Sequence, residues 1–335
     1  MTAHKSHPPI DTELRTTVWP ELREHQAAQA ELTDEEFQQL VASTPDIWAP
    51  DFRSDTGLHV RELTIPAADG EESLPVLIIA PADRESSALP CVYYTANGGK
   101  MLQSTRMALT PVESRWVTDL GIVFVSISPR VGPAHRHPAQ VEDAYRGLVW
   151  ISENSSELGI DPERIMIMGK SGGGGIAAAT ALYARDQHGP RLAHQILICP
   201  MLDDRQATVS SGYDVAPWTS DNNRVGWNAI LGNASGGTDV SEYAAPARAT
   251  DLTDLPPAYL EVGSSEVFRD ETLDYGSRLA QAGVPVELHS WSGGFHNFEI
   301  FAPNAEISHA CIAARTSYIE RALSASLPRK EIVND

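Results

Sequence analysis

The chain has 335 residues and a formal net charge of −20, because 25 lysines and arginines stand against 45 aspartates and glutamates. A chain of this length buries roughly 75% of the surface that its unfolded form exposes, so its core requires no disulfide or metal. Phosphate backbones and anionic lipids repel such a chain, which argues against nucleic acid and membrane partners. One large domain, or a core with a lid, is expected.

The cysteine pattern predicts no disulfide framework and no metal centre. Cys91, Cys199 and Cys311 lie far apart and form no C-x-x-C pair, so we expect reduced, structural cysteines in a cytoplasmic protein. The first 15 residues are polar and hold no apolar signal-peptide core. No run of 18 apolar residues occurs, so we predict no membrane span.

Helices are predicted first along the chain, and strands follow from about residue 58. Residues 33–36 (TDEE) form a capping box, followed by Phe37, Leu40 and Val41 at helical spacing. The predicted strands are apolar runs at residues 74–79, 91–94, 122–127, 165–168, 196–199 and 258–262, with helical stretches such as 141–157 and 176–185 between the later ones. This alternation predicts an α/β fold with a mainly parallel sheet covered on both faces.

A glycine-rich turn at residues 169–175 lies between a predicted strand and a predicted helix, a layout that three chemistries share. A phosphate-binding P-loop is excluded, because Arg164 occupies the position of its first glycine. Gly172, Gly174 and Ala177 fit the dinucleotide pattern G-x-G-x-x-A. That match is weak on its own, because Asp203 lies farther on than the ~20 residues expected of a ribose-binding acid.

The third interpretation is a nucleophile elbow, because residues 169–173 fit G-x-S-x-G with Ser171 at its centre. The N–H of Gly172 and the start of the helix would face an oxyanion. Glu266 follows the strand that begins at residue 257, and His296 follows another predicted strand at residues 284–288. The order serine, acid, histidine is typical of α/β-hydrolases.

Three carboxylates compete for the acid position, and several histidines compete for the base. Asp270 and Glu271 suit the first turn of a helix, whereas Glu266 lies nearest the strand end. Glycines and aromatic residues surround His296 in its loop. His135 and His137 are spaced like metal ligands, but no third ligand lies near them, so we predict no metal site.

From about residue 90 to the C-terminus, the chain resembles the hormone-sensitive-lipase-like family of bacterial esterases, within the α/β-hydrolase fold. The similar segments include one like the family's R-L-A-P-E-H-x-x-P, at residues 130–138, and others at 141–145, 158–165 and 200–203. The resemblance implies an eight-stranded core and a helical cap. The core would comprise residues 56–200 and 251–335, and the cap residues 1–55 and the insertion 201–250.

The same resemblance implies hydrolysis of short-chain or small acyl esters without a cofactor. Residue by residue, Ser171 matches the nucleophile and His296 the base, while Glu266 stands where most members have aspartate. A serine hydroxyl reacts when a neutral imidazole takes its proton and a carboxylate orients that imidazole. Family members often form homodimers, so a homodimer is the expected assembly.

The oxyanion loop departs from the family's H-G-G-G pattern. It reads Asn97-Gly98-Gly99-Lys100, so a lysine replaces the third glycine. Glycines serve in such a loop because its N–H groups must face the oxyanion without a Cβ in the way. We expect the N–H groups of Gly98, Gly99 and Gly172 to form the oxyanion hole.

Two lysines, Lys100 and Lys170, flank the predicted nucleophile in a strongly acidic chain. One hypothesis is that they favour an ester or lactone that bears a carboxylate. The alternative is that they pair with acids such as Glu142 or Asp143. A comparison of neutral and carboxylate-bearing esters distinguishes the two interpretations.

The predicted function is therefore that of a serine carboxylester hydrolase working through an acyl-enzyme. Trp218 and Trp227, nine positions apart in the insertion, would line the substrate pocket together with the N-terminal helices, or would only pack the lid. The alternative function is ligand binding on a hydrolase scaffold that has lost its chemistry. Such proteins typically lose a triad member, and all three are present here.

Overall fold

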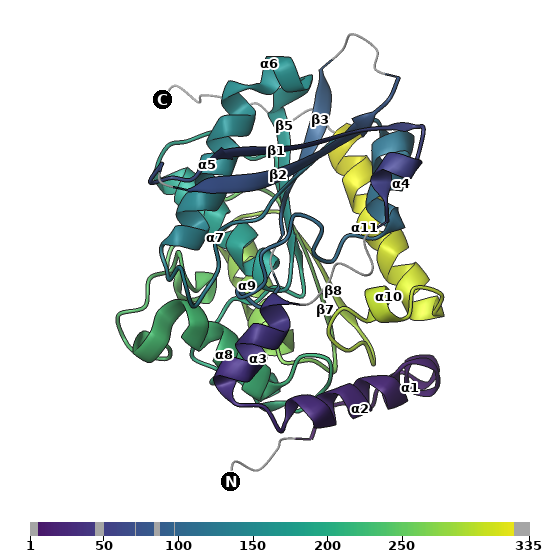
Figure 1. Cartoon of the computed structure of the whole chain (residues 1–335), viewed down its shortest axis with the longest axis vertical. Helices are drawn as coiled ribbons and strands as arrows, with labels where there is room; N and C mark the ends of the chain where they lie inside the picture. Colours follow the sequence, from purple (N-terminus) through teal and green to yellow (C-terminus); the bar gives the residue numbers. More distant parts are fainter. Residues whose placement is uncertain (1–5, 44–49, 71, 84–87, 97, 325–335) are drawn as a thin grey trace.

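Eight strands form one sheet in the order β1-β2-β4-β3-β5-β6-β7-β8, which confirms the eight-stranded α/β-hydrolase core that the family resemblance implied. The computed structural model describes residues 6–43, 50–70, 72–83, 88–96 and 98–324. β2 pairs antiparallel with β1 and β4, and the remaining pairs are parallel (Figure 1). The strands are β1 (Leu58–Pro66), β2 (Ser73–Pro81), β3 (Leu89–Thr95), β4 (Val123–Ile127), β5 (Ile160–Lys170), β6 (His194–Ile198), β7 (Ala258–Gly263) and β8 (Val286–Trp291).

Burial explains which strands the sequence revealed. All five residues of β4 and all six of β7 are buried, so these strands are near-continuous apolar runs. β1 lies at the edge of the sheet, and among its residues only Leu58 and Ile65 are buried. Its sequence therefore mixes charged and apolar residues, and no apolar run marks it.

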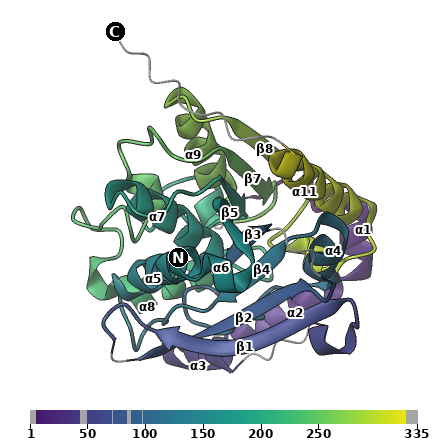
Figure 2. The ribbon, with the colours of Figure 1, turned by 90° about the horizontal axis from the view of Figure 1, so that it is seen from above.

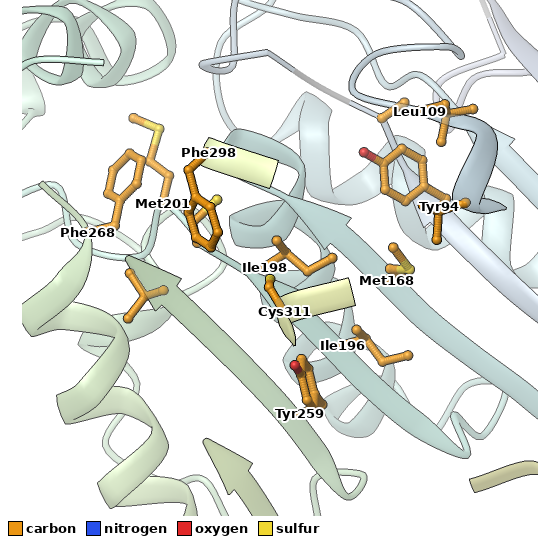
Figure 3. Packing of buried hydrophobic residues seen from close by; sticks show 14 of the residues in the cluster. Tyr94, Leu109, Met168, Ile196, Ile198, Met201, Tyr259, Phe268, Phe298 and Cys311 are labelled. Carbon is orange, nitrogen blue, oxygen red and sulfur yellow. The ribbon is translucent and has the colours of Figure 1, made fainter. Parts of the chain in front are cut away.

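Helices cover both faces of the sheet (Figure 2). One face carries α5 (Ala139–Glu153), α6 (Ser155–Leu158), α7 (Gly172–Asp186) and α9 (Arg269–Gln281). The other face carries α4 (Pro111–Leu120) and α11 (Glu306–Ser324), with the short α10 (Phe298–Phe301) leading into α11. The core between α11 and the sheet is apolar, with Met168, Ile196, Ile198 and Cys311 close together (Figure 3).

Four further helices lie together at one end of the sheet, although most of the sheet core separates the fourth from the first three along the chain (Figure 1). They are α1 (Thr12–Thr17), α2 (Trp19–Gln29), α3 (Asp34–Ala42) and α8 (Ser220–Leu231). Arg224 of α8 forms a bidentate pair with Asp34, at 2.8 and 2.9 Å. The predicted capping box is confirmed at the start of α3, where Thr33 and Glu36 bond reciprocally.

The starts of α1 and α2 contact the loop that follows β8. The N–H of Asp11 donates to the carbonyl of Gly293 at 3.0 Å. The ring of Trp19 lies 5.7 Å from that of Phe295. None of the helices in the described part of the chain is long and apolar enough to cross a lipid bilayer.

Candidate active site

Ser171 lies at the sharp turn between β5 and α7. Its backbone has φ 55° and ψ −124°, a left-handed conformation that a serine adopts only where the surrounding structure enforces it. The turn is tight because the strand and helix pass close together: a Cβ added at Gly169 would lie 2.3 Å from the Gly173 carbonyl oxygen. The N–H of Ser171 donates to the Ile198 carbonyl at 2.9 Å. The G-x-S-x-G pattern therefore has the backbone geometry of a nucleophile elbow.

A chain of two hydrogen bonds joins Ser171 to a histidine and a carboxylate. Nε2 of His296 lies 2.9 Å from Oγ of Ser171, and Nδ1 lies 2.6 Å from Oε2 of Glu266. The other carboxylate oxygen of Glu266 accepts the N–H of Gly263 at 2.8 Å. All three side chains are buried, with at most 7% exposure. This arrangement can make the serine hydroxyl nucleophilic.

The two competing carboxylates have other partners. Asp270 accepts the N–H of Ser210 at 2.8 Å and pairs with Arg269. Glu271 accepts the N–H groups of Leu202 and Asp203 with one oxygen. Of the three carboxylates, Glu266 is the one that contacts His296.

Aromatic rings lie near His296, and the thiol of Cys199 hydrogen-bonds to the next residue, Asn297. The Phe268 ring lies 5.2 Å from the imidazole, edge to face, and the Trp218 ring lies 6.5 Å away. Sγ of Cys199 donates to Oδ1 of Asn297 at 3.2 Å. Cys199 and Asn297 both have positive φ, at 37° and 57°. No motif predicts this thiol contact next to His296, because it joins two residues that lie far apart in the chain.

The oxyanion loop follows β3, and its described part comprises residues 98–102; Asn97 lies outside the described residues. The structure differs here from the prediction for Gly98. Its N–H donates to the Leu102 carbonyl at 3.3 Å, because the loop turns back on itself, and Leu102 returns a bond of 2.9 Å. Among the described residues, the N–H groups of Gly99 and Lys100 have no hydrogen-bond partner.

Lys100 and Lys170 direct their ammonium groups into the protein, with 2% of each residue exposed. Nζ of Lys170 donates to the Ala108 carbonyl at 2.8 Å and to Glu113 at 3.2 Å, and the Lys170–Glu113 pair is buried. Nζ of Lys100 donates to the Ala244 carbonyl at 3.2 Å. Neither ammonium is placed to meet a substrate carboxylate, and the expected partners Glu142 and Asp143 are not the ones used.

The two tryptophans of the insertion occupy different environments. A Cβ added at Gly99 would lie 2.2 Å from the Trp218 ring, so this ring packs directly on the oxyanion loop as well as near His296. Trp227 is fully buried in the core, with Lys100 above its ring. Trp218 therefore borders the site, whereas the sequence prediction for Trp227 is not supported.

His135 and His137, which were considered as a metal site, lie in different surroundings. Nε2 of His135 lies 3.4 Å from Glu72, and burial lowers the pKa of His137 to about 4. Among the described ranges, the histidines, cysteines and acids close enough to share an ion are Cys199, Glu266 and His296. In that group, the Glu266 carboxylate and the imidazole already bond each other.

Comparison with known proteins identifies relatives over most of the chain. A family model described as the alpha/beta hydrolase fold matches residues 92–300. The carboxylesterase NlhH of Mycobacterium tuberculosis is 34% identical over 259 residues, which are 74% of this chain and 79% of that protein.

Solved structures of esterases also match this chain over most of its length. A structure titled bacterial heroin esterase superposes with a TM-score of 0.77 at 34% identity, covering 94% of this chain and 98% of the other. An esterase from Pyrobaculum calidifontis superposes with a TM-score of 0.78 at 27% identity, covering 95% and 100%.

Proposed function

Because the chain belongs to the α/β-hydrolase family and is a carboxylic ester hydrolase, we propose that Ser171 is its nucleophile, His296 its general base and Glu266 the acid that orients His296. The hydrogen-bond chain from Ser171 through His296 to Glu266 carries this proposal. A serine with this backbone geometry, at the start of a helix, presents its hydroxyl where an acyl carbonyl can approach.

The reaction proceeds in two steps. Nε2 of His296 takes the proton as Oγ of Ser171 attacks the ester carbonyl, and the protonated imidazole then gives that proton to the departing alcohol. Water repeats the sequence on the acyl-enzyme and releases the acid. Glu266 accepts the Nδ1–H of His296 throughout, which fixes the tautomer and stabilises the imidazolium.

We propose that the N–H groups of Gly99, Lys100 and Gly172 stabilise the oxyanion, so that Lys100 takes the place first expected for Gly98. The N–H of Gly98 already has a partner, whereas those of Gly99 and Lys100 have none among the described residues. Gly172 begins α7, and the first N–H groups of a helix have no acceptor within it. The helix dipole at this end favours negative charge as well.

Replacing Gly99 by alanine is expected to lower kcat by about 10²- to 10³-fold, the loss typical of one oxyanion donor. Gly99 has φ 56°, and its new Cβ would overlap the Trp218 ring, so the loop must shift. A Gly121→Ala variant is the matched control, because Gly121 also has positive φ (62°) but nothing lies within 4 Å of an added Cβ. Equal kcat in both variants, measured on a p-nitrophenyl ester, contradicts the assignment.

We propose that the substrates are short-chain, uncharged acyl esters. Trp218 lies over Gly99 and near His296, which limits the room beside the reacting carbonyl. The carboxylate preference considered from the sequence is not part of the proposal, because both ammonium groups are bound inside the protein. We further propose that α1–α3 and the insertion 201–250 form the cap; the homodimer and the cytoplasmic location stay predictions.

The proposal is tested with p-nitrophenyl esters from acetate to octanoate and with diethyl p-nitrophenyl phosphate, which phosphorylates an activated serine as p-nitrophenolate leaves. We expect turnover to fall with acyl length, and one phosphoryl group per chain, located on Ser171 by mass spectrometry of peptides. Labelling at another residue disproves the assignment of the nucleophile. If neither turnover nor labelling is observed, the result favours the alternative, a ligand-binding protein on a hydrolase scaffold.

A further inference from the structure

One buried cation links the oxyanion loop to three other segments. Nζ of Lys100 donates to the Ala244 carbonyl in the insertion and lies 4.4 Å from the ring centroid of Trp227 in α8. A Cβ added at Gly175 would lie 3.4 Å from this nitrogen, so the ammonium also packs against the backbone of α7. Lys100 therefore joins its loop to the insertion and to the helix that follows the proposed nucleophile.

The backbone around Lys100 is held on both sides. Its carbonyl accepts the N–H of Gly132 at 3.0 Å, and the N–H of Gly98 donates to Leu102. Lys100 has φ 62°, a left-handed conformation that is unfavourable for a residue with a Cβ. Contacts of its side chain must offset this strain, and the contacts found are those with Ala244 and Trp227.

Burial of the ammonium also has a cost. Burial lowers the pKa of Lys100 from its usual 10.5 to about 7, and the carboxylates of Asp204 and Glu271 act in the opposite direction. An apolar side chain of the same length would fill the space without this cost. Because burial of the Lys100 ammonium is unfavourable, its presence points to a role in fixing the geometry of the loop rather than in stabilising the fold.

We propose that the Lys100 side chain is a positioning residue of the oxyanion hole, holding the N–H groups of Gly99 and Lys100 in place by its bond to Ala244 and its contact with Trp227. This inference rests on the proposed esterase function. The backbone N–H and the side chain of Lys100 share one Cα, so fixing the ammonium fixes the orientation of the N–H. Oxyanion donors are effective when they need no reorganisation during the reaction.

The test replaces Lys100 by methionine, which is unbranched and only slightly shorter, keeps the Cβ on the left-handed backbone and removes the ammonium. We expect kcat on p-nitrophenyl acetate to fall about 10- to 100-fold, the range that a displaced catalytic group produces, with KM nearly unchanged. The inhibition constant of phenylboronic acid, which binds a serine hydroxyl as a tetrahedral anion, should rise by the same factor. The thermal midpoint should change little, because removal of a buried cation opposes the loss of the contacts that offset the strain at φ 62°.

Two variants complete the experiment. Lys100→Gly relieves the strain at φ 62°, so it keeps the test possible if the methionine variant fails to fold, and it should lose kcat similarly. Arg321→Met is the matched control, because it removes an exposed cation of α11 that pairs with Glu287; its kcat should equal the wild-type value.

The inference is overturned if both Lys100 variants keep the wild-type kcat and boronate affinity, or if KM alone changes. A lower thermal midpoint with unchanged boronate affinity would show a purely structural role and also overturns it. Ser171→Ala separates this result from failure of the proposed function. Turnover that persists without Ser171 overturns both proposals, whereas serine-dependent turnover with unaffected Lys100 variants overturns this one alone.

Discussion

Ser171→Ala and His296→Ala are each expected to lower kcat by about 10⁶-fold, as the loss of one member disables a triad that acts as a unit. In the proposed mechanism the hydroxyl of Ser171 attacks the ester, and Nε2 of His296, which lies 2.9 Å away, is the base. The double variant should lose no more than either single variant, because each change already removes the serine–imidazole pair. Residual activity would come from the oxyanion donors.

The Glu266→Gln variant separates the role of the acid from the roles of Ser171 and His296. The amide keeps the size of the side chain, but it can present its NH₂ group to Nδ1 and so favour the wrong imidazole tautomer. A fall in kcat of about 10⁴-fold is expected, smaller than for the serine or the histidine. Glu266→Asp tests whether a shorter carboxylate still reaches Nδ1 of His296, since aspartate is the usual acid in the resembled family but is one methylene shorter.

Steady-state kinetics on one p-nitrophenyl ester measures all these variants. His309→Ala is the control for the histidine change, because His309 is exposed on α11 and should keep the wild-type kcat. If the losses of kcat of the two single variants multiply in the double variant, Ser171 and His296 do not act as one unit. Wild-type kcat in Glu266→Gln would contradict its assignment as the acid.

The sequence was sufficient to predict the elements of this site that local patterns encode. G-x-S-x-G marks a turn whose glycines are required by close approach of backbone atoms, as at Gly169. The fully buried strands β4 and β7 produce continuous apolar runs. Glu266 was favoured because it lies nearest a strand end, and parallel strands bring their carboxyl ends to one edge of the sheet.

Long-range side-chain contacts could not be predicted in the same way. Lys170 pairs with Glu113, which is 57 residues earlier, and no spacing rule relates the two positions. Lys100 reaches Ala244, which is 144 residues later. The sequence left open whether the two lysines meet a ligand or pair with acids of the protein, because the destination of a long side chain depends on which buried acceptors tertiary packing supplies.

Arg315→Met is expected to lower the free energy of unfolding by about 3–5 kcal/mol, the cost of removing one partner of a buried ion pair. Arg315 on α11 is 1% exposed and donates to Glu261 of β7 with Nε at 2.8 Å, and also contacts it through Nη2. Nη2 further donates to Glu299 at 3.2 Å. Without the guanidinium, two carboxylates would remain close together in the core.

The neighbours of Glu261 reduce this loss without removing it. Its second oxygen accepts the hydroxyl of Tyr259 at 2.7 Å and the indole N–H of Trp291 at 3.2 Å. Neutral donors of this kind stabilise a buried carboxylate less than a guanidinium does. Glu261 lies two residues before Gly263, whose N–H holds Glu266, so a loosened end of β7 should also disturb the acid loop.

Urea unfolding monitored by tryptophan fluorescence measures the effect, and Arg321→Met on the same helix provides the matched control. Arg321 pairs with Glu287 at 2.7 Å, but their side chains are 59% and 30% exposed, so its loss should cost at most about 1 kcal/mol. Arg315→Met/Glu261→Gln should recover much of the lost stability, because the unpaired charge at Glu261 is then gone. Equal losses for Arg315→Met and Arg321→Met would show that burial does not strengthen this pair.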